Sequence, residues 1–232
     1  MKLVTVAGPP SSGKTSVILR VIESLEAKGQ STCVVKFDCL PSRDAARYAE
    51  KKVPVRTGLS GPICPDHFFV SNIQDALTWG LTTGADVMIT ESAGLCNRCS
   101  PHIREVLAVC VIDNLSGIHT PAKIGPMLRT ADMVVVTKGD VVSQAEREVF
   151  AFRVRRVAPG ARIVQINGIT GQGAFVLARE VGAAAAPPTL SGKRLRFTMP
   201  AAVCSYCLGE RRIGRDAQIG YTRNMNFTDE NP

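Results

Sequence analysis

Long hydrophobic runs are missing from this sequence of 232 residues. The longest apolar stretches, such as Val106 to Ile112, are the length of a strand and fall far short of the roughly 20 residues that a bilayer-spanning helix needs. The N-terminal residues also lack a secretory pattern. We therefore expect a cytoplasmic protein that does not associate with membranes.

Aromatic residues are scarce too, at 5% of the chain, and glycine and proline number only 20 and 14. These numbers exclude a collagen-like chain, and a hydrophobic fraction of 45% beside 21% charged residues excludes intrinsic disorder. The length suits one large α/β domain, or one domain with a small appendage.

Cysteine and positive charge are abundant: there are eight cysteines, and the formal net charge is +8. In a reducing cytosol cysteines rarely form a disulfide framework, so paired cysteines are better interpreted as metal or redox groups. The basic charge is compatible with a phosphate ligand, nucleic acid or an acidic partner, and also with a merely solvated surface.

Strand patterns and helix patterns alternate along most of the chain. The strand patterns cover residues 3–7, 32–38, 86–91, 106–113, 133–138 and 162–167. The helix patterns cover residues 14–29, 43–52, 70–81, 121–129, 144–157 and 174–182. This alternation predicts an α/β fold with a mostly parallel central sheet flanked by helices, and with ligands at the carboxyl ends of the strands.

The composition changes near residues 182–188, where alanine-rich sequence runs into Pro187 and Pro188. This change predicts a domain over residues 1–185 and a C-terminal extension over residues 186–232. Within the extension, residues 194–198 could add a strand.

A phosphate-binding loop is predicted at residues 8–15, which read Gly-Pro-Pro-Ser-Ser-Gly-Lys-Thr between a strand and a helix. In such a loop, backbone N–H groups surround the phosphates, Lys14 reaches the β- and γ-phosphates, and Thr15 binds Mg²⁺. The residues expected to bind nucleotide here are Gly8, Pro9, Ser11, Ser12, Gly13, Lys14, Thr15 and Ser16.

A second nucleotide motif, Thr137-Lys138-Gly139-Asp140, ends the strand that begins at Met133. The Asp140 carboxylate could accept hydrogen bonds from N1–H and the 2-amino group of guanine, whereas adenine offers no matching pair of donors. The motif therefore favours GTP over ATP, and it adds Thr137, Lys138 and Asp140 to the predicted site.

Acidic residues end several of the predicted strands. Glu91 is predicted to hold Mg²⁺ through water or to orient the attacking water, and Asp38 is predicted to lie beside the γ-phosphate. With Lys14 they form the predicted catalytic set. Asp113 has two interpretations, a secondary role in the site or a cap on the turn that follows.

In this order, the motifs resemble those of SIMIBI-class P-loop GTPases, specifically the metal-centre maturation GTPases that insert nickel into urease and hydrogenase. The resemblance covers most of residues 3–182 and includes segments 37–38, 63–67, 89–94, 111–113 and 166–173. It implies Mg²⁺-dependent hydrolysis of GTP, and it places Asn167 and Gly168 at the nucleotide.

The chain departs from the urease relative at Cys64-Pro65-Asp66-His67, where that relative has Cys-Pro-His. Cys64 and His67 still offer a thiolate and an imidazole to a soft or borderline divalent ion, although the inserted Asp66 changes the spacing. The alternative is a nucleotide-switch loop in which the cysteine is incidental.

Two Cys-x-x-Cys pairs, Cys96/Cys99 and Cys204/Cys207, supply four more thiolates. A closed zinc or iron–sulfur site needs four ligands. Either the second pair folds back to join the first, or a two-fold axis brings Cys96 and Cys99 against their copies in a homodimer. A resemblance to dimerising ATPases such as the nitrogenase iron protein favours the shared site.

The other cysteines and the basic C-terminal residues carry weaker predictions. Cys33 and Cys110 lie within strand patterns and are expected in the core, while Cys39 has no assignment. Four arginines near two tyrosines could bind nucleic acid. No known nucleic-acid-binding module is present, however, so we do not expect nucleic acid to be a partner. These residues are Arg211, Arg212, Arg215, Arg223, Tyr206 and Tyr221.

The leading functional hypothesis is a homodimeric, Mg²⁺-dependent GTPase that acts as a metallochaperone or assembly factor for a client metalloenzyme. Its cysteines would carry Ni²⁺, Zn²⁺ or an iron–sulfur cluster, and GTP would favour the closed dimer. One alternative is an electron-transfer ATPase with a [4Fe–4S] cluster bridging the dimer. Another is a non-enzymatic interaction module that uses nucleotide and zinc for structure.

Overall fold

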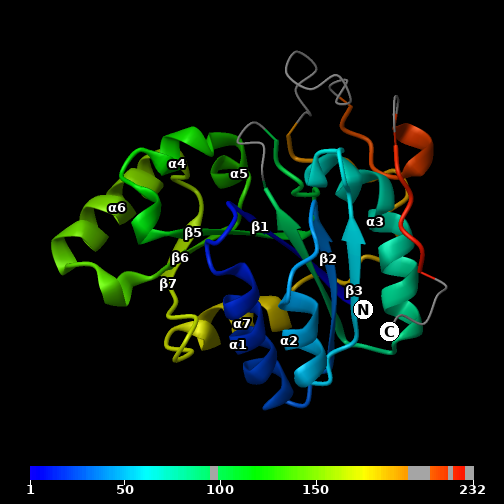
Figure 1. Ribbon diagram of the computed structural model, residues 1–232, viewed down its shortest axis with the longest axis horizontal. Coiled ribbons are helices and arrows are strands. Elements are labelled where there is room, and N and C mark those ends of the chain that lie inside the picture. Colours follow the sequence, from blue (N-terminus) through cyan, green and yellow to red (C-terminus); the bar gives the residue numbers. More distant parts are fainter. Residues whose placement is uncertain (95–98, 198–209, 219–221, 228–232) are drawn as a thin grey trace.

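The computed structural model describes residues 1–232 except 95–98, 198–209, 219–221 and 228–232. Its centre is a seven-stranded sheet in the order β3-β2-β4-β1-β5-β6-β7, in which every pair of neighbours is parallel (Figure 1). The strands are β1 (Lys2–Gly8), β2 (Thr32–Asp38), β3 (Val55–Leu59), β4 (Val87–Ala93), β5 (Leu107–Asp113), β6 (Met133–Thr137) and β7 (Arg162–Gln165). The predicted α/β class with a parallel sheet is confirmed.

Helices cover both faces of the sheet because alternate strand residues point to opposite faces. On one face, Val4 and Val6 pack in a hydrophobic cluster with α1 (Lys14–Glu26), α2 (Asp44–Glu50) and α7 (Ala174–Gly182). On the other face lie α3 (Pro65–Thr82), α4 (Thr120–Lys123), α5 (Gly125–Arg129) and α6 (Gln144–Val157). Among the described residues, no helix is both long enough and apolar enough to cross a membrane.

The structure differs from the predicted elements in three places that concern the site. β3 has no counterpart in the prediction, because this edge strand reads Val-Arg-Thr-Gly-Leu and is mostly half-buried, so its apolar pattern is weak. Helix α3 begins at Pro65 rather than at residue 70, since proline needs no N–H partner in a first turn. β4 continues to Ala93, so Glu91 lies inside the strand.

The described part of the C-terminal extension packs against α3 (Figure 1). The buried side chains that join the α3 cluster are Leu190, Leu195, Ile213 and Met225. Asn72 on α3 holds this segment at two backbone positions, since its side chain donates to the carbonyl of Arg223 and accepts from the N–H of Met225. The predicted boundary near residue 185 stays a prediction.

Where the sequence pattern favoured a further strand over residues 194–198, the described residues form only isolated bridges, Arg194 with Arg212 and Leu195 with Ile103. The bridge between Leu195 and Ile103 ties the extension to the segment that follows Cys99, and the other bridge lies within the extension.

Candidate functional site

The predicted phosphate loop lies between β1 and α1, at the carboxyl edge of the sheet. Its backbone takes left-handed angles at Ser11 and at Gly13, whose φ is 90°. Lys14 is buried, and its Nζ donates to the carbonyl oxygens of Gly8 at 3.0 Å and Pro9 at 2.8 Å. Burial lowers the pKa of Lys14, although the nearby Glu91 opposes that effect. The lysine is thus held against the loop to which the sequence assigns the phosphates.

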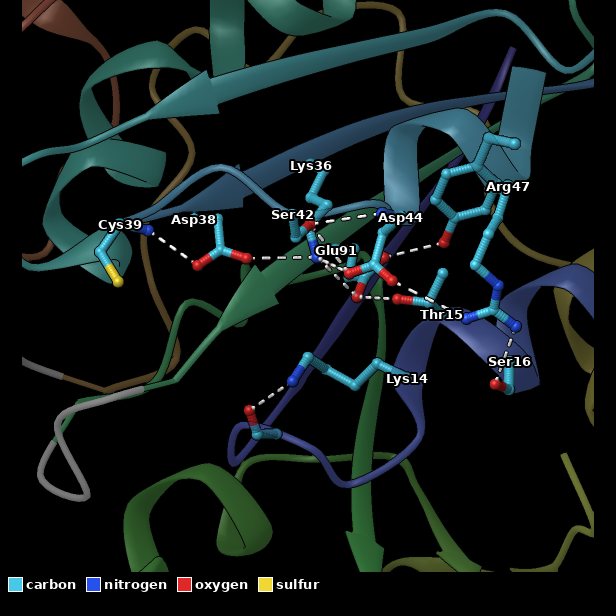
Figure 2. A network of polar contacts seen from close by, with 12 residues as sticks. Lys14, Thr15, Ser16, Lys36, Asp38, Cys39, Ser42, Asp44, Arg47 and Glu91 are labelled. Atoms are coloured by element: carbon cyan, nitrogen blue, oxygen red, sulfur yellow. Dashed lines mark hydrogen bonds and ion pairs between the residues drawn. The ribbon is translucent and has the colours of Figure 1, made fainter. Parts of the chain in front are cut away.

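Thr15 and Glu91 meet beside this loop (Figure 2). The Thr15 hydroxyl donates to Oε1 of Glu91 at 2.7 Å, and the buried Tyr48 hydroxyl donates to Oε2 at 2.8 Å. Burial, and then the charge of Glu91, raises the pKa of Tyr48 well above its usual value, so that its proton stays on the phenol. A hydroxyl and carboxylate oxygens are the hard donors that Mg²⁺ prefers, so these residues fit the predicted ion.

Lys36 lies at the centre of the same network, where it faces three carboxylates. Burial lowers its pKa, but the charges of Glu91, Asp44 and Asp38 outweigh burial and raise the pKa overall. Burial raises the pKa of Asp44, but the hydrogen bond and charge of Lys36, together with hydrogen bonds to Ser42 and Thr15, lower it overall. Lys36 and Asp44 therefore stabilise each other's charged form.

Two cavities flank the P-loop helix at the carboxyl ends of the strands. A cavity of about 440 Å³ is lined by the phosphate loop together with Lys36, Asp38, Asp44, Arg47 and Glu91. A second cavity, of about 360 Å³, is lined by residues that include Gly139, Asp140, Asn167, Gly173 and Phe175. The first cavity suits a polyphosphate, and the second suits a base.

The Thr137 motif is joined directly to the phosphate loop. The hydroxyl of Thr137 donates to the carbonyl of Ser12 at 2.7 Å, and Lys138 pairs with Asp113 at 3.4 Å. Asp113 Oδ1 also accepts from the N–H of Leu115, so that this carboxylate both caps the turn and contacts the motif. Asp140 lies in the short 3-10 helix Gly139–Val141, directly after this motif's strand, and it lines the second cavity.

Residues 167–168 also lie against the P-loop helix. The Asn167 side chain accepts from the N–H groups of Ile169 and Thr170, so it shapes its own turn. A Cβ on Gly168 would approach Cβ of Ser16 to 2.9 Å, so that only glycine allows this close packing.

Sequence reasoning missed four residues of the phosphate site: Lys36, Asp44, Arg47 and Tyr48. Lys36 was the detectable one, since a lysine inside an otherwise apolar strand signals a buried charge that needs partners. The other three come from α2, whose short pattern gives no hint that it packs over the loop. Arg47 donates to the Ser16 hydroxyl at 3.1 Å.

A cluster of metal-binding groups lies on the opposite face of β4. Ligand atoms of Cys64, Asp66 and Cys99 all lie within 4.8 Å of one another, the one such group among the described residues. The Ser92 hydroxyl donates to Oδ1 of Asp66 at 2.8 Å in a buried setting. His67 is buried in the next position of α3 and is not part of this group.

The structure therefore brings together two motifs that the sequence kept apart, Cys64 and Cys99, and adds the carboxylate of Asp66. The extra residue in Cys-Pro-Asp-His was the available signal, because Asp66 lies in the first turn of α3 beside Cys64. Cys96, Cys204 and Cys207 lie outside the described residues.

The remaining described cysteines divide as the sequence indicated. Cys33 and Cys110 are fully buried in the core, where burial raises their pKa values to about 11 and about 12. Such thiols stay protonated near neutral pH and are poor metal ligands. Cys39 is half-buried beside Asp38, whose carboxylate accepts its backbone N–H.

Three arginines of the extension form ion pairs or hydrogen bonds with other residues of the protein. Arg212 pairs with Glu210, Arg215 pairs with Asp75, and Arg211 donates to the carbonyl of Arg196. Their charges therefore serve internal contacts in this structure.

The parallel sheet, the phosphate loop and the cavity that this loop lines define a P-loop nucleotide-binding protein. The sequence profile described as CobW/HypB/UreG, nucleotide-binding domain, matches residues 2–165. The chain belongs to this family.

Similar proteins include the uncharacterized protein MJ0120 of Methanocaldococcus jannaschii, which is 43% identical over 97% of each chain. The urease accessory protein UreG 2 of Streptomyces griseus is 27% identical over 73% of this chain and 81% of its own. The hydrogenase maturation factor HypB of Azotobacter vinelandii is 26% identical over 74% of this chain and 56% of its own.

Two solved structures share the fold. HypB from Archaeoglobus fulgidus superimposes with a TM-score of 0.62 at 18% identity, covering 79% of this chain and 89% of that one. HypB from Helicobacter pylori, solved in complex with nickel, also gives 0.62, at 19% identity over 78% of this chain and 85% of that one.

Proposed function

We propose that the chain is a Mg²⁺-dependent GTPase that acts in the cytoplasm as a metallochaperone or metallocentre-assembly factor, and that its cargo metal binds at Cys64, Asp66 and Cys99. One observation carries the proposal: consecutive residues of β4 serve the two sites. Glu91 bonds to Thr15 at the phosphate loop, and Ser92 bonds to Asp66 beside the two thiols. A change at the nucleotide therefore has a short path to the metal.

At the nucleotide site, each role follows from position and charge. The phosphate loop and Lys14 would bind the β- and γ-phosphates, and Thr15 with Glu91 would hold Mg²⁺, which would supply positive charge to offset the negative charge of the phosphates. Asp38 lies where it can orient the attacking water, because it lines the same cavity as Lys14 and Glu91. Asp140, which lines the second cavity, would select guanine over adenine.

At the cysteine cluster, two thiol groups and one carboxylate suit a borderline divalent ion such as Ni²⁺ or Zn²⁺. Three ligands leave a tetrahedral site open, which suits a cargo that must later be released. A fourth ligand would come from His67 or Cys96, from Cys204 and Cys207, or from a second copy of the chain. The HypB structure from Helicobacter pylori in complex with nickel supports Ni²⁺ as a cargo.

The extension supports a fourth ligand from within the chain. Leu195 donates to Arg211 at 2.7 Å, and Arg196 donates to the carbonyl of His102, so both ends of segment 197–210 are fixed beside the residues that follow Cys99. A homodimer that shares Cys96 and Cys99 remains the competing arrangement, and the client would be a metalloenzyme or its assembly proteins.

The test is anaerobic metal analysis of the wild type beside Cys96→Ala and Cys204→Ala, with Cys39→Ala as the control. Wild type should bind one Ni²⁺ or Zn²⁺ per chain and hydrolyse GTP faster than ATP. Loss of metal in both variants would indicate that the C-terminal cysteine pair completes the metal site within one chain. Loss of metal in Cys96→Ala alone would indicate a site that is shared by two chains or built without that pair. A brown protein that contains iron and sulfide would instead favour the alternative function, an electron-transfer ATPase. An absence of both metal binding and hydrolysis would refute the proposal.

A further inference from the structure

Lys36 is a buried cation that neither nucleotide motif explains. Its side chain is 4% exposed, and its Nζ lies 2.6 Å from Asp44 Oδ2, 3.2 Å from Asp38 Oδ2 and 3.4 Å from Glu91 Oε1. These carboxylates come from the end of β2, from α2 and from β4, so that one ammonium joins three elements around the phosphate cavity (Figure 2).

Lys36 contacts the same carboxylate that is predicted to hold Mg²⁺, that of Glu91. Oε1 of Glu91 is the same atom that accepts the Thr15 hydroxyl at 2.7 Å, and Lys36 lies opposite Glu91 in the register of β2 and β4. Both side chains point to the face that carries α1, because Val34 and Ile89, two residues before each, pack in the cluster with α1. The ammonium and the ion predicted at Thr15 therefore share a ligand oxygen.

Among the described residues, Lys36 is the one cation that pairs with all three carboxylates, whereas Arg47 pairs with Asp44 alone, at 3.7 Å. When no divalent ion is bound, the Lys36 ammonium therefore keeps the three carboxylates together, because buried like charges otherwise repel one another strongly.

We propose that Lys36 is a positioning residue that occupies the carboxylate side of the Mg²⁺ site while nucleotide is absent, so that the ion binds tightly only together with the phosphates. The inference rests on the nucleotide site of the proposed function. Mg²⁺ arriving alone would have to displace the ammonium from Glu91 and leave a buried charge with fewer partners, which is costly. Phosphate oxygens arriving in the same cavity give the displaced ammonium new partners.

The test measures binding of Mn²⁺, a paramagnetic substitute for Mg²⁺, by the loss of its free electron paramagnetic resonance signal. All proteins carry Cys64→Ser and Cys99→Ser, so that the cysteine cluster does not contribute. Without nucleotide, Lys36→Met should bind one Mn²⁺ at least about tenfold more tightly than the Lys36 protein, because a positive charge has left a buried oxygen site. Lys36→Arg, which keeps the charge, should bind Mn²⁺ as weakly as the Lys36 protein.

With saturating GDP, the Lys36→Met and Lys36 proteins should bind Mn²⁺ within about threefold of each other, since the phosphates have then removed the competition. Equal Mn²⁺ affinity of the two proteins without nucleotide would overturn the proposal. If Lys36→Met does not fold, the double variant Lys36→Met/Asp44→Asn is compared with Asp44→Asn in the absence of nucleotide. Tighter Mn²⁺ binding by the double variant supports the proposal, and equal Mn²⁺ binding overturns it.

This measurement needs neither hydrolysis nor delivery of a metal. The proposed function could fail through absence of GTP turnover while the Mn²⁺ result stands, and the reverse is equally visible.

Discussion

The two proposed ligand sites lie on opposite faces of one strand, and their side chains differ in chemistry. On the face that carries α1, Glu91 belongs to a network of carboxylates, two hydroxyls and two lysines, which are hard polar and charged groups suited to Mg²⁺ and phosphate. On the face that carries α3, Ser92 contacts a carboxylate beside two thiols, a softer donor set. The alternation of side chains along β4 thus keeps a hard and a softer set of donor groups apart.

The two sites also differ in what balances their charge. The phosphate site holds its own cation in Lys36, so its carboxylates are paired in the structure. The cysteine cluster lies at the start of α3, an 18-residue helix whose N-terminal dipole favours negative charge. The first site is suited to an ion that accompanies a nucleotide, and the second to a cation that is collected and released.

The largest expected effect is on the phosphate site alone. Lys14→Ala should lower the rate of GTP hydrolysis by about 10²–10³-fold, because it removes a fixed positive charge from the transition state. Metal bound at the cysteine cluster, measured by equilibrium dialysis without nucleotide, should be unchanged. The control is Lys28→Ala, on an exposed lysine just beyond α1. Hydrolysis that survives in Lys14→Ala would mean that the loop has been misassigned.

Selectivity for the base should change next. Asp140→Asn should reduce the preference for GTP over ATP by about 10–100-fold, because a hydrogen bond to a charged group is lost at the second cavity. Competition binding with the two nucleotides measures the ratio, with the exposed Asp216→Asn as the control. If wild type binds ATP as tightly as GTP, the role given to Asp140 is wrong.

At the other site, Cys99→Ser should weaken Zn²⁺ or Ni²⁺ binding at least about tenfold and leave GTP hydrolysis without added metal unchanged. Cys39→Ser is the matched control, since Cys39 lies near the phosphate site and not in the cluster. Equal metal binding in the two variants would remove Cys99 from the site.

The extent to which the sequence predicts these two sites depends on how close together their residues lie in the sequence. The phosphate loop and the Thr137 motif are contiguous, so their residues and their neighbours in space follow from spacing alone. The cysteine cluster joins Cys64 to Cys99 across 35 positions, and only the order of strands in the sheet brings them together. Asp66 was treated as an insertion because its place in the first turn of α3 depends on where that helix begins. Lys36 was absent from the prediction because its partners lie on three elements.

The smallest effect concerns a buried group that takes part in neither site. His102 is fully buried near Thr5, and burial lowers its pKa to about 3, so the folded protein holds it neutral. In the unfolded chain, His102 gains a proton near pH 6.5. Its contribution to the folding free energy is therefore fully present above that pH, and it is lost progressively as the pH falls from 6.5 toward 3. The loss attributable to this group is at most about 1.4 kcal/mol per pH unit.

Urea unfolding of wild type and His102→Gln between pH 7 and pH 4.5 would measure this difference. Parallel pH profiles for the two proteins would show that His102 gains its proton in the folded state as readily as in the unfolded one.

The central claim is that the two faces of β4 are coupled through Ser92. Metal affinity is measured by competition with a chromogenic chelator, for wild type and Ser92→Ala, with GDP or with a nonhydrolysable GTP analogue. In wild type the two affinities should differ at least about fivefold, a typical allosteric coupling, and in Ser92→Ala the ratio should fall toward one while nucleotide affinity without metal is kept. A wild-type ratio of one would contradict the account.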